Sequence, residues 1–173
     1  DLHSFPTRRS SDLEPDTVSA IEEIRKLTKA LTTGIIRNFG LCEAIENIAH
    51  DTMEVNPIKI SCVLDTLIEE KVSDKLKLTI FRIIQEQINN ILKHAKATEA
   101  VISLSQNKIS ITLNITDNGI GFDPGIKRKG IGLDNIKSRA ISYSGHADFI
   151  SQHGKGCILI ATFPVTDELT NKK

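Results

Sequence analysis

Apolar residues recur along this chain with two different periods, which predicts an alternation of helices and strands. Over residues 16–32, and again over 41–49, they recur every three or four positions, the spacing of one buried helix face. A longer helix is predicted from Ser73, a residue suited to capping, to about residue 96, and another over 131–143. The segments between these helices contain runs with the shorter period of a strand.

Alternation of apolar and polar residues marks the strands. It is cleanest over residues 109–116, where every second residue is apolar. Shorter alternating runs occur at 58–62, 100–104, 147–151 and 157–163, and a tight turn before residue 109 predicts an antiparallel hairpin. Together with the helices, these strands predict an α+β fold, a two-layer sandwich with helices on one face of a mixed sheet.

The composition narrows the classes of function. The 173 residues carry 22 basic and 22 acidic side chains, so the net charge is zero, and no apolar run is long enough to cross a bilayer. We therefore expect no nucleic-acid partner and no direct membrane contact of this chain. Cys42, Cys62 and Cys157 lie far apart, which argues against disulfides or a zinc site. A reducing, cytoplasmic location follows, whether or not the parent protein is membrane-anchored.

The first residues of the chain are unlike the rest. Residues 1–13 show neither a helical nor a strand period and are rich in serine, arginine and aspartate. Residues 2–13 resemble the translation of a sequencing adaptor, so we expect residues 1–13 to be an artefact rather than natural protein. A disordered tail is the alternative.

One face of the long helix carries an unusual polar line. At the α-helical pitch, Glu86, Asn90 and Lys93 fall close together, opposite the apolar face. Such a triplet is usually a solvated face with an i,i+4 pair. Asparagine is a poor helix former, however, and a carboxylate, an amide oxygen and an ammonium on one line could also hold a hard cation and a phosphate chain together.

Two glycine-containing loops follow the cleanest strand. ITDNGIGFDP (115–124) leaves the strand, and KGIGLDNI (129–136) opens the next helix. Each could be a simple turn, but glycines at a helix start leave backbone N–H groups free for an anion. A dinucleotide-binding loop is excluded, because Gly119-Ile120-Gly121 is followed by Phe-Asp-Pro rather than by a helix.

Four segments resemble, in order and spacing, the N, G1, G2 and G3 boxes of the GHKL ATPases, which include gyrases, chaperones, histidine kinases and mismatch-repair proteins. Two earlier segments, IEEIRKLTKAL and GLCEAIENI, resemble the end of the dimerisation helix and the following helix of sensor histidine kinases of the nitrate-sensor subclass. The resemblance covers residues 16–165 and implies a Bergerat-type sandwich with a mostly antiparallel sheet. The four boxes are QEQINNILKHA (85–95), TDNGIGFDP (116–124), GIGLDNI (130–136) and GKGC (154–157).

The resemblance implies that the chain binds ATP with Mg²⁺, and it assigns residues to the base. Asp117 would accept a hydrogen bond from the adenine amino group, while Gly119 and Gly121 would let the backbone pass close to the base. The family usually has threonine where this chain has Cys157. One hydrogen bond near the base, worth about 1 kcal/mol, is therefore expected to be missing.

At the phosphate end, the resemblance assigns Asn90 to Mg²⁺ and Glu86 to orienting a water or accepting a proton near the γ-phosphate. Lys93 would neutralise phosphate charge, and His94 belongs to the same site without a defined role. The second loop completes this end. Its candidate contacts are Gly130 and Gly132, with free backbone N–H groups, the neighbouring Leu133, and a lid over residues 122–129 whose basic residues 127–129 would reach the phosphates.

By this resemblance the chain is the catalytic part of a sensor histidine kinase. Residues 14–38 would be part of the dimerisation helix and its linker, 39–166 the ATP-binding domain, and 167–173 a tail. The whole protein would form a homodimer and transfer the ATP γ-phosphoryl group to a histidine, for relay to the receiver domain of a response regulator.

The acceptor histidine is expected outside this sequence. His50 is followed by Asp51, as in an acceptor pair, but it lies after the dimerisation segment, and we expect it at the surface. An ATP-responsive regulatory module without phosphotransfer is the alternative function. A plain interaction domain, whose glycine loops are only turns, is a third.

Overall fold

The fold is described from a computed structural model, which covers residues 34, 36–64, 67–123 and 131–165. The predicted artefact, the predicted helix over 16–32 and the tail over 167–173 lie outside these residues, as do most of the predicted lid and Gly130. Among the described residues, no helix is long and apolar enough to span a membrane.

Helices and strands alternate along the described chain as the sequence predicts. Each predicted strand is present and lies within about two residues of its expected bounds. The elements are α2 (Leu41–Val55), β1 (Lys59–Val63), η1 (Glu69–Lys71), α3 (Asp74–Asn90), η2 (Ile91–Ala95), β2 (Glu99–Gln106), β3 (Ser110–Asp117), α4 (Ile131–Ile141), β4 (His146–Ser151) and β5 (Cys157–Pro164).

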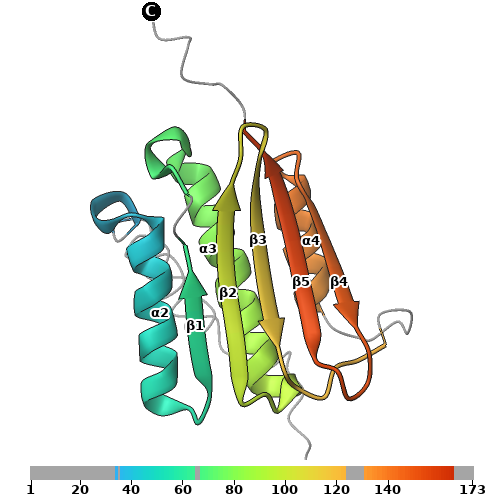
Figure 1. Cartoon of the computed structure of the whole chain (residues 1–173). Coiled ribbons are helices and arrows are strands. Elements are labelled where there is room, and N and C mark those ends of the chain that lie inside the picture. Colours follow the sequence, from blue (N-terminus) through green and yellow to red (C-terminus); the bar gives the residue numbers. More distant parts are fainter. Residues whose placement is uncertain (1–33, 35, 65–66, 124–130, 166–173) are drawn as a thin grey trace, which may run out of the picture.

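The five strands form one mixed sheet in the order β1-β2-β3-β5-β4. Strand β1 pairs parallel with β2, and every other pair is antiparallel. Figure 1 shows the sheet as one layer and the helices as the other. The predicted α+β sandwich with a mostly antiparallel sheet is therefore confirmed.

The core lies between the sheet and the helices. On β3, Ile111, Leu113 and Ile115 are fully or almost fully buried, and the residues between them are only partly buried. On the helix side of the core, α3 contributes four buried isoleucines, Ile80, Ile83, Ile84 and Ile88. Each such side chain contributes about 1.5–3 kcal/mol when it leaves water. Asp117 continues the buried series of β3, so its side chain points toward the helices.

The long helix differs from its prediction at the carboxyl end. Its start is as predicted, because the Ser73 hydroxyl accepts a hydrogen bond from Leu76 N at 3.3 Å. The α-helix ends at Asn90, and a π-helical turn completes the element. The Ala95 carbonyl accepts a hydrogen bond from Ile120 N at 2.8 Å, so a partner from the glycine loop satisfies the end of this helix. The wider turn rotates the residues after Asn90 away from the predicted polar line.

An acidic side chain from a distant segment caps α2. The helix begins after Gly40, which has no side chain to cap it. Instead, the Glu69 carboxylate accepts hydrogen bonds from Leu41 N at 2.6 Å and Cys42 N at 2.8 Å, and Lys77 Nζ lies 3.6 Å from it. Burial alone would raise the pKa of Glu69, but these hydrogen bonds and the lysine outweigh it and lower the pKa.

Candidate functional site

A buried carboxylate lies at the end of β3. Asp117 is only 4 % exposed, and its Oδ1 accepts a hydrogen bond from Gly119 N at 2.9 Å. Burial raises the pKa of Asp117, while the N–H groups of Gly119 and Cys157 oppose this effect. None of the described residues forms an ion pair with it. A carboxylate can accept about four hydrogen bonds, so Asp117 has acceptor capacity left for a ligand.

The loop after Asp117 is packed too closely for side chains. A Cβ atom at Gly119 would clash with the backbone carbonyl of Ala95, because the loop lies directly against the end of η2. Gly121 is buried, with φ at +61°. Gly119 therefore lets the loop lie against η2, and Gly121 lets it lie against the backbone of Gln152 and Gly156, which a side chain at either position would prevent.

A second glycine turn closes the same region from β5. A Cβ atom at Gly156 would clash with the carbonyl of Asp117, and the Gly156 carbonyl accepts a hydrogen bond from the Ser151 hydroxyl at 2.7 Å. The same hydroxyl accepts a bond from Phe122 N at 2.9 Å. Sequence reasoning quoted this turn as part of a box but assigned no role to Gly156 or Ser151. The glycine immediately before a buried strand was the available signal.

Cys157 faces Asp117 from the neighbouring strand, since the two residues are paired in the sheet register. Its thiol is buried, and burial together with the charge of Asp117 raises its pKa to about 11, against a hydrogen bond with Ser151. The thiol is therefore protonated at neutral pH. It adds no second negative charge beside Asp117.

Glu86 and Asn90 meet the first turn of α4. A Cβ atom at Gly132 would lie 2.8 Å from Glu86 Oε1 and 3.0 Å from Asn90 Oδ1, so both oxygens face the glycine. Asn90 Nδ2 donates to Gln87 Oε1 at 3.5 Å, which leaves Asn90 Oδ1 as an acceptor. A carboxylate and an amide oxygen side by side are ligands suited to Mg²⁺.

Asp117 and Asn90 lie on the same side of the sheet. Asp117 points into the helix layer, and its loop contacts Ala95, which is five residues beyond Asn90 on the same helical element. That separation corresponds to roughly 7 Å along the helix axis. The two predicted parts of the site therefore belong to one region, bounded by the end of β3, helix α3–η2 and the start of α4.

The remaining predicted residues are less closely integrated. Lys93 and His94 are exposed on η2, and no described contact joins them to Glu86 or Asn90. Leu133 is half-buried in the first turn of α4. Of the predicted lid, Phe122 is described and places its ring 6.5 Å from that of Phe149.

His50 is at the surface as predicted, and so are His146 and His153. His50 is exposed, close to Asp51 and Glu54. His146 bonds Asp148 at 2.7 Å on the exposed side of β4, and His153 is exposed in the turn that follows. None of them lies against the residues that form the candidate site.

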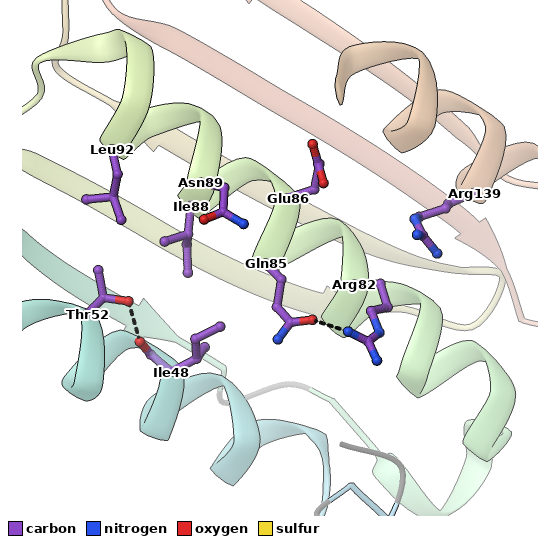
Figure 2. Close-up of a pocket in the computed structure, with 9 residues that line it drawn as sticks. All are labelled: Ile48, Thr52, Arg82, Gln85, Glu86, Ile88, Asn89, Leu92 and Arg139. Atoms are coloured by element: carbon purple, nitrogen blue, oxygen red, sulfur yellow. Dashed lines mark hydrogen bonds between the residues drawn. The ribbon is translucent and has the colours of Figure 1, made fainter. Parts of the chain in front are cut away.

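A hollow of about 420 Å³ adjoins the site, between α2, α3 and α4. Figure 2 shows Glu86 at its edge, together with Arg82 from α3 and Arg139 from α4. Arg82 Nη1 donates to Gln85 Oε1 at 2.9 Å. Sequence reasoning missed both arginines. Arg82 lies one helical turn before Glu86, which was a usable signal, whereas Arg139 has none.

Comparison with known families decides the identity of this arrangement. Residues 75–167, more than half of the chain, match the family described as histidine kinase-, DNA gyrase B- and HSP90-like ATPases. The chain belongs to this family of ATPases. The matched residues of this ATPase domain include Glu86, Asn90, Asp117 and Gly132, which the fold brings into one region.

The ATPase domain is similar to several sensor histidine kinases. The chain is 32% identical to the sensor histidine kinase LiaS of Bacillus subtilis over 151 residues, covering 86% of this chain and 41% of that protein. It is 26% identical to the oxygen sensor histidine kinase NreB of Staphylococcus carnosus over 149 residues, 85% of this chain and 43% of that protein. The chain spans less than half the length of these relatives.

Solved structures show the same fold. The histidine kinase domain of a blue-light activated kinase from Erythrobacter litoralis matches with a TM-score of 0.58 at 18% identity, over 72% of this chain and 61% of that one. The ATP-binding domain of PrrB from Mycobacterium tuberculosis matches with a TM-score of 0.56 at 21% identity, over 73% of this chain and 94% of that one.

Proposed function

We propose that this domain binds ATP with Mg²⁺ and is the catalytic part of a sensor histidine kinase of the nitrate-sensor type. The observation that supports this most strongly is the position of Gly132, where a Cβ atom would meet both Glu86 Oε1 and Asn90 Oδ1. These groups lie on the same side of the sheet as buried Asp117. The family match makes ATP the expected ligand of such a region.

The base would bind at the closed end of the site. The Asp117 carboxylate accepts a hydrogen bond from the adenine amino group, and this contact disfavours guanine, whose oxygen at the same position is an acceptor. The backbone next to Gly119 and Gly121 borders the base. Protonated Cys157 leaves the charge of Asp117 available to the donor.

The phosphates would extend from Asp117 toward the first turn of α4. Backbone N–H groups of Gly130, Gly132 and the neighbouring Leu133 would donate to the phosphate oxygens. Asn90 Oδ1 would hold Mg²⁺, which neutralises phosphate charge when bound. Lys93 and His94 would approach this end from η2.

The transfer step would exchange one bond for another. A ring nitrogen of the acceptor histidine forms a bond to the γ-phosphorus as the bond to the oxygen of the leaving ADP breaks, and the Glu86 carboxylate accepts the proton that the ring gives up. The acceptor belongs to a dimerisation helix of the whole protein, which would act as a cytoplasmic homodimer. The phosphoryl group then passes to an aspartate of a response regulator receiver domain.

The test combines binding with transfer. The chain is titrated with ATP and Mg²⁺ by calorimetry and then mixed with a separately produced dimer of an acceptor helix and γ-labelled ATP. We expect acid-labile label on the acceptor, and we expect Asn90→Ala to abolish it while Asn114→Ala, on the face of β3 that is turned away from the helices, retains it. Binding of ATP without any label on the acceptor would contradict the kinase proposal and support a regulatory module.

A further inference from the structure

Two arginines face the hollow beside Glu86 without an acidic partner. Arg82 on α3 and Arg139 on α4 both line it, as Figure 2 shows. Arg82 bonds the neutral side chain of Gln85 at 2.9 Å, and neither arginine forms an ion pair with a described residue. Partial burial and the charge of Arg139 lower the pKa of Arg82. Two guanidinium groups that repel each other in this way form a site suited to an anion.

The arginines lie beyond Glu86 on the side away from Asn90. Arg82, Glu86 and Asn90 follow at steps of four on α3, so they share one face at intervals of about 6 Å. Glu86 and Asn90 face Gly132 in the first turn of α4, whereas Arg139 lies about two turns later. Helices α3 and α4 are therefore antiparallel, and the order along their groove is Asn90, Glu86, then the arginine pair.

The lining of the hollow is mostly polar, with three apolar side chains among its nine residues. Ile48 from α2 and Ile88 and Leu92 from α3–η2 line it, and Leu92 is 39% exposed. The lining thus offers a small apolar contact beside the two guanidinium groups. A helix that carries an apolar strip and a carboxylate side chain complements both features.

We propose that the Arg82–Arg139 pair binds a carboxylate side chain of the helix that carries the phosphoacceptor histidine, and so positions that helix beside Glu86. This inference rests on the proposed function, which places the γ-phosphoryl group near Glu86 and Asn90. The acceptor must approach Glu86 from the side that the phosphates leave open, and the arginine pair borders that side. The two arginines are positioning residues, because they contact the partner helix rather than the transferred group.

The experiment measures recognition of a carboxylate directly. Two fluorescent helical peptides of about 20 residues, long enough to hold a helix, carry one apolar strip and one histidine and differ only in an Asp or an Asn next to that histidine. Their affinities for the full chain are measured by anisotropy at low ionic strength, with Mg²⁺ and a non-hydrolysable ATP analogue. The variants are Arg82→Gln with Arg139→Gln, Arg139→Gln alone, and Lys137→Gln. Lys137 is an exposed residue of α4 that does not line the hollow, so its variant is the matched control for loss of charge.

We expect the Asp peptide to bind the wild type more tightly than the Asn peptide, and the double variant to lose about tenfold for the Asp peptide alone. Lys137→Gln should lose much less. Replacing both arginines by glutamate should reverse the preference toward a third peptide with Lys in place of Asp. These variants change exposed or half-exposed side chains, and Arg139→Gln alone gives the same reading if the double variant is unstable.

Three results would overturn the proposal. In the first, the wild type binds the Asp and Asn peptides equally or not at all. In the second, Lys137→Gln loses as much peptide affinity as Arg139→Gln. In the third, the arginine variants lose nucleotide affinity. The last result would place the phosphates themselves at the arginines, while the proposal that the wild type binds ATP would still stand. Absence of nucleotide binding to the wild type would contradict the proposed function instead, and the peptide preference is measured independently in nucleotide-free protein.

Discussion

Replacing Asp117 by asparagine tests the base end of the site with the smallest possible change in shape. The carboxylate is 4 % exposed and already accepts hydrogen bonds from the N–H groups of Gly119 and Cys157. An asparagine can keep its oxygen on these donors. Its remaining group is then an NH₂ donor, which would face the amino group of adenine, also a donor.

The expected loss follows from these contacts. A hydrogen bond to a charged acceptor contributes about 1.5–3 kcal/mol, and a buried donor left without an acceptor costs about 1–3 kcal/mol. Because asparagine retains the backbone contacts and can rotate partly, we expect a net loss of about 2–3 kcal/mol, or about 30- to 150-fold in the Kd of ATP. Discrimination against GTP should fall at the same time, since the NH₂ group can donate to the guanine oxygen.

The stability of the fold should move in the opposite direction. Burial raises the pKa of Asp117 above 3.8, so the folded state binds its proton more tightly than the unfolded state does. The ionised group therefore lowers the free energy of unfolding as the pH rises above 3.8 and through the folded-state pKa. Asp117→Asn removes this cost, and its melting temperature at neutral pH should equal or exceed that of the wild type.

Calorimetry with ATP and with GTP, together with thermal unfolding, separates these effects. Asp51→Asn is the matched control, because it makes the same substitution on an exposed position of α2. The assignment of Asp117 to adenine is refuted if Asp117→Asn is folded and binds ATP within about twofold of the wild type, a difference far below the hydrogen-bond energies above.

Three further outcomes are expected. Glu69 has a lowered pKa, so its stabilisation is complete above 4.5 and is lost as the pH falls through the folded-state value; acid unfolding followed by circular dichroism should be less steep in Glu69→Gln, and an unchanged slope would count against the cap. Gly132→Ala should weaken ATP binding in calorimetry by crowding Glu86 without lowering the melting temperature, whereas Gly119→Ala should destabilise the fold; equal melting temperatures would contradict this. Cys157→Thr should tighten ATP binding about fivefold by restoring one hydrogen bond, and an unchanged Kd would show that the hydroxyl has no partner.

The sequence predicted the fold because most of its information is local. The strict alternation before Asp117 and the three-to-four-residue spacing from Ser73 onward each specify one element and its buried face. Once those faces must meet in one core, Asp117 and Asn90 have to lie on the same side of the sheet. Periodicity therefore predicted that buried Asp117 lies on the same side of the sheet as Glu86 and Asn90, whose oxygens face Gly132.

The residues that were missed depend on tertiary contacts. Glu69 caps a helix 28 positions away in the chain, and no local pattern signals such a contact. Arg139 acquires its neighbour Arg82 only because α4 packs antiparallel to α3. The π-helical turn after Asn90 likewise ends on a tertiary contact, since the Ala95 carbonyl accepts a hydrogen bond from Ile120 N of the glycine loop. The periodicity of one element contains no information about a hydrogen-bonding or charged partner on another element.

The two ends of the site are built in physically different ways, and this difference makes variants interpretable. At the base end, Asp117 and its glycines are fixed by backbone contacts, so a Cβ atom there disturbs folding and binding together. At the phosphate end, Glu86 and Asn90 are half-buried side chains whose tips can move, so changes there should affect binding with little loss of stability. Apart from Glu86, whose carboxylate is the proposed proton acceptor, a variant that keeps both its stability and its nucleotide affinity yet fails to transfer the phosphoryl group should therefore act outside both ends. The arginine pair beyond Glu86 is where we expect such variants.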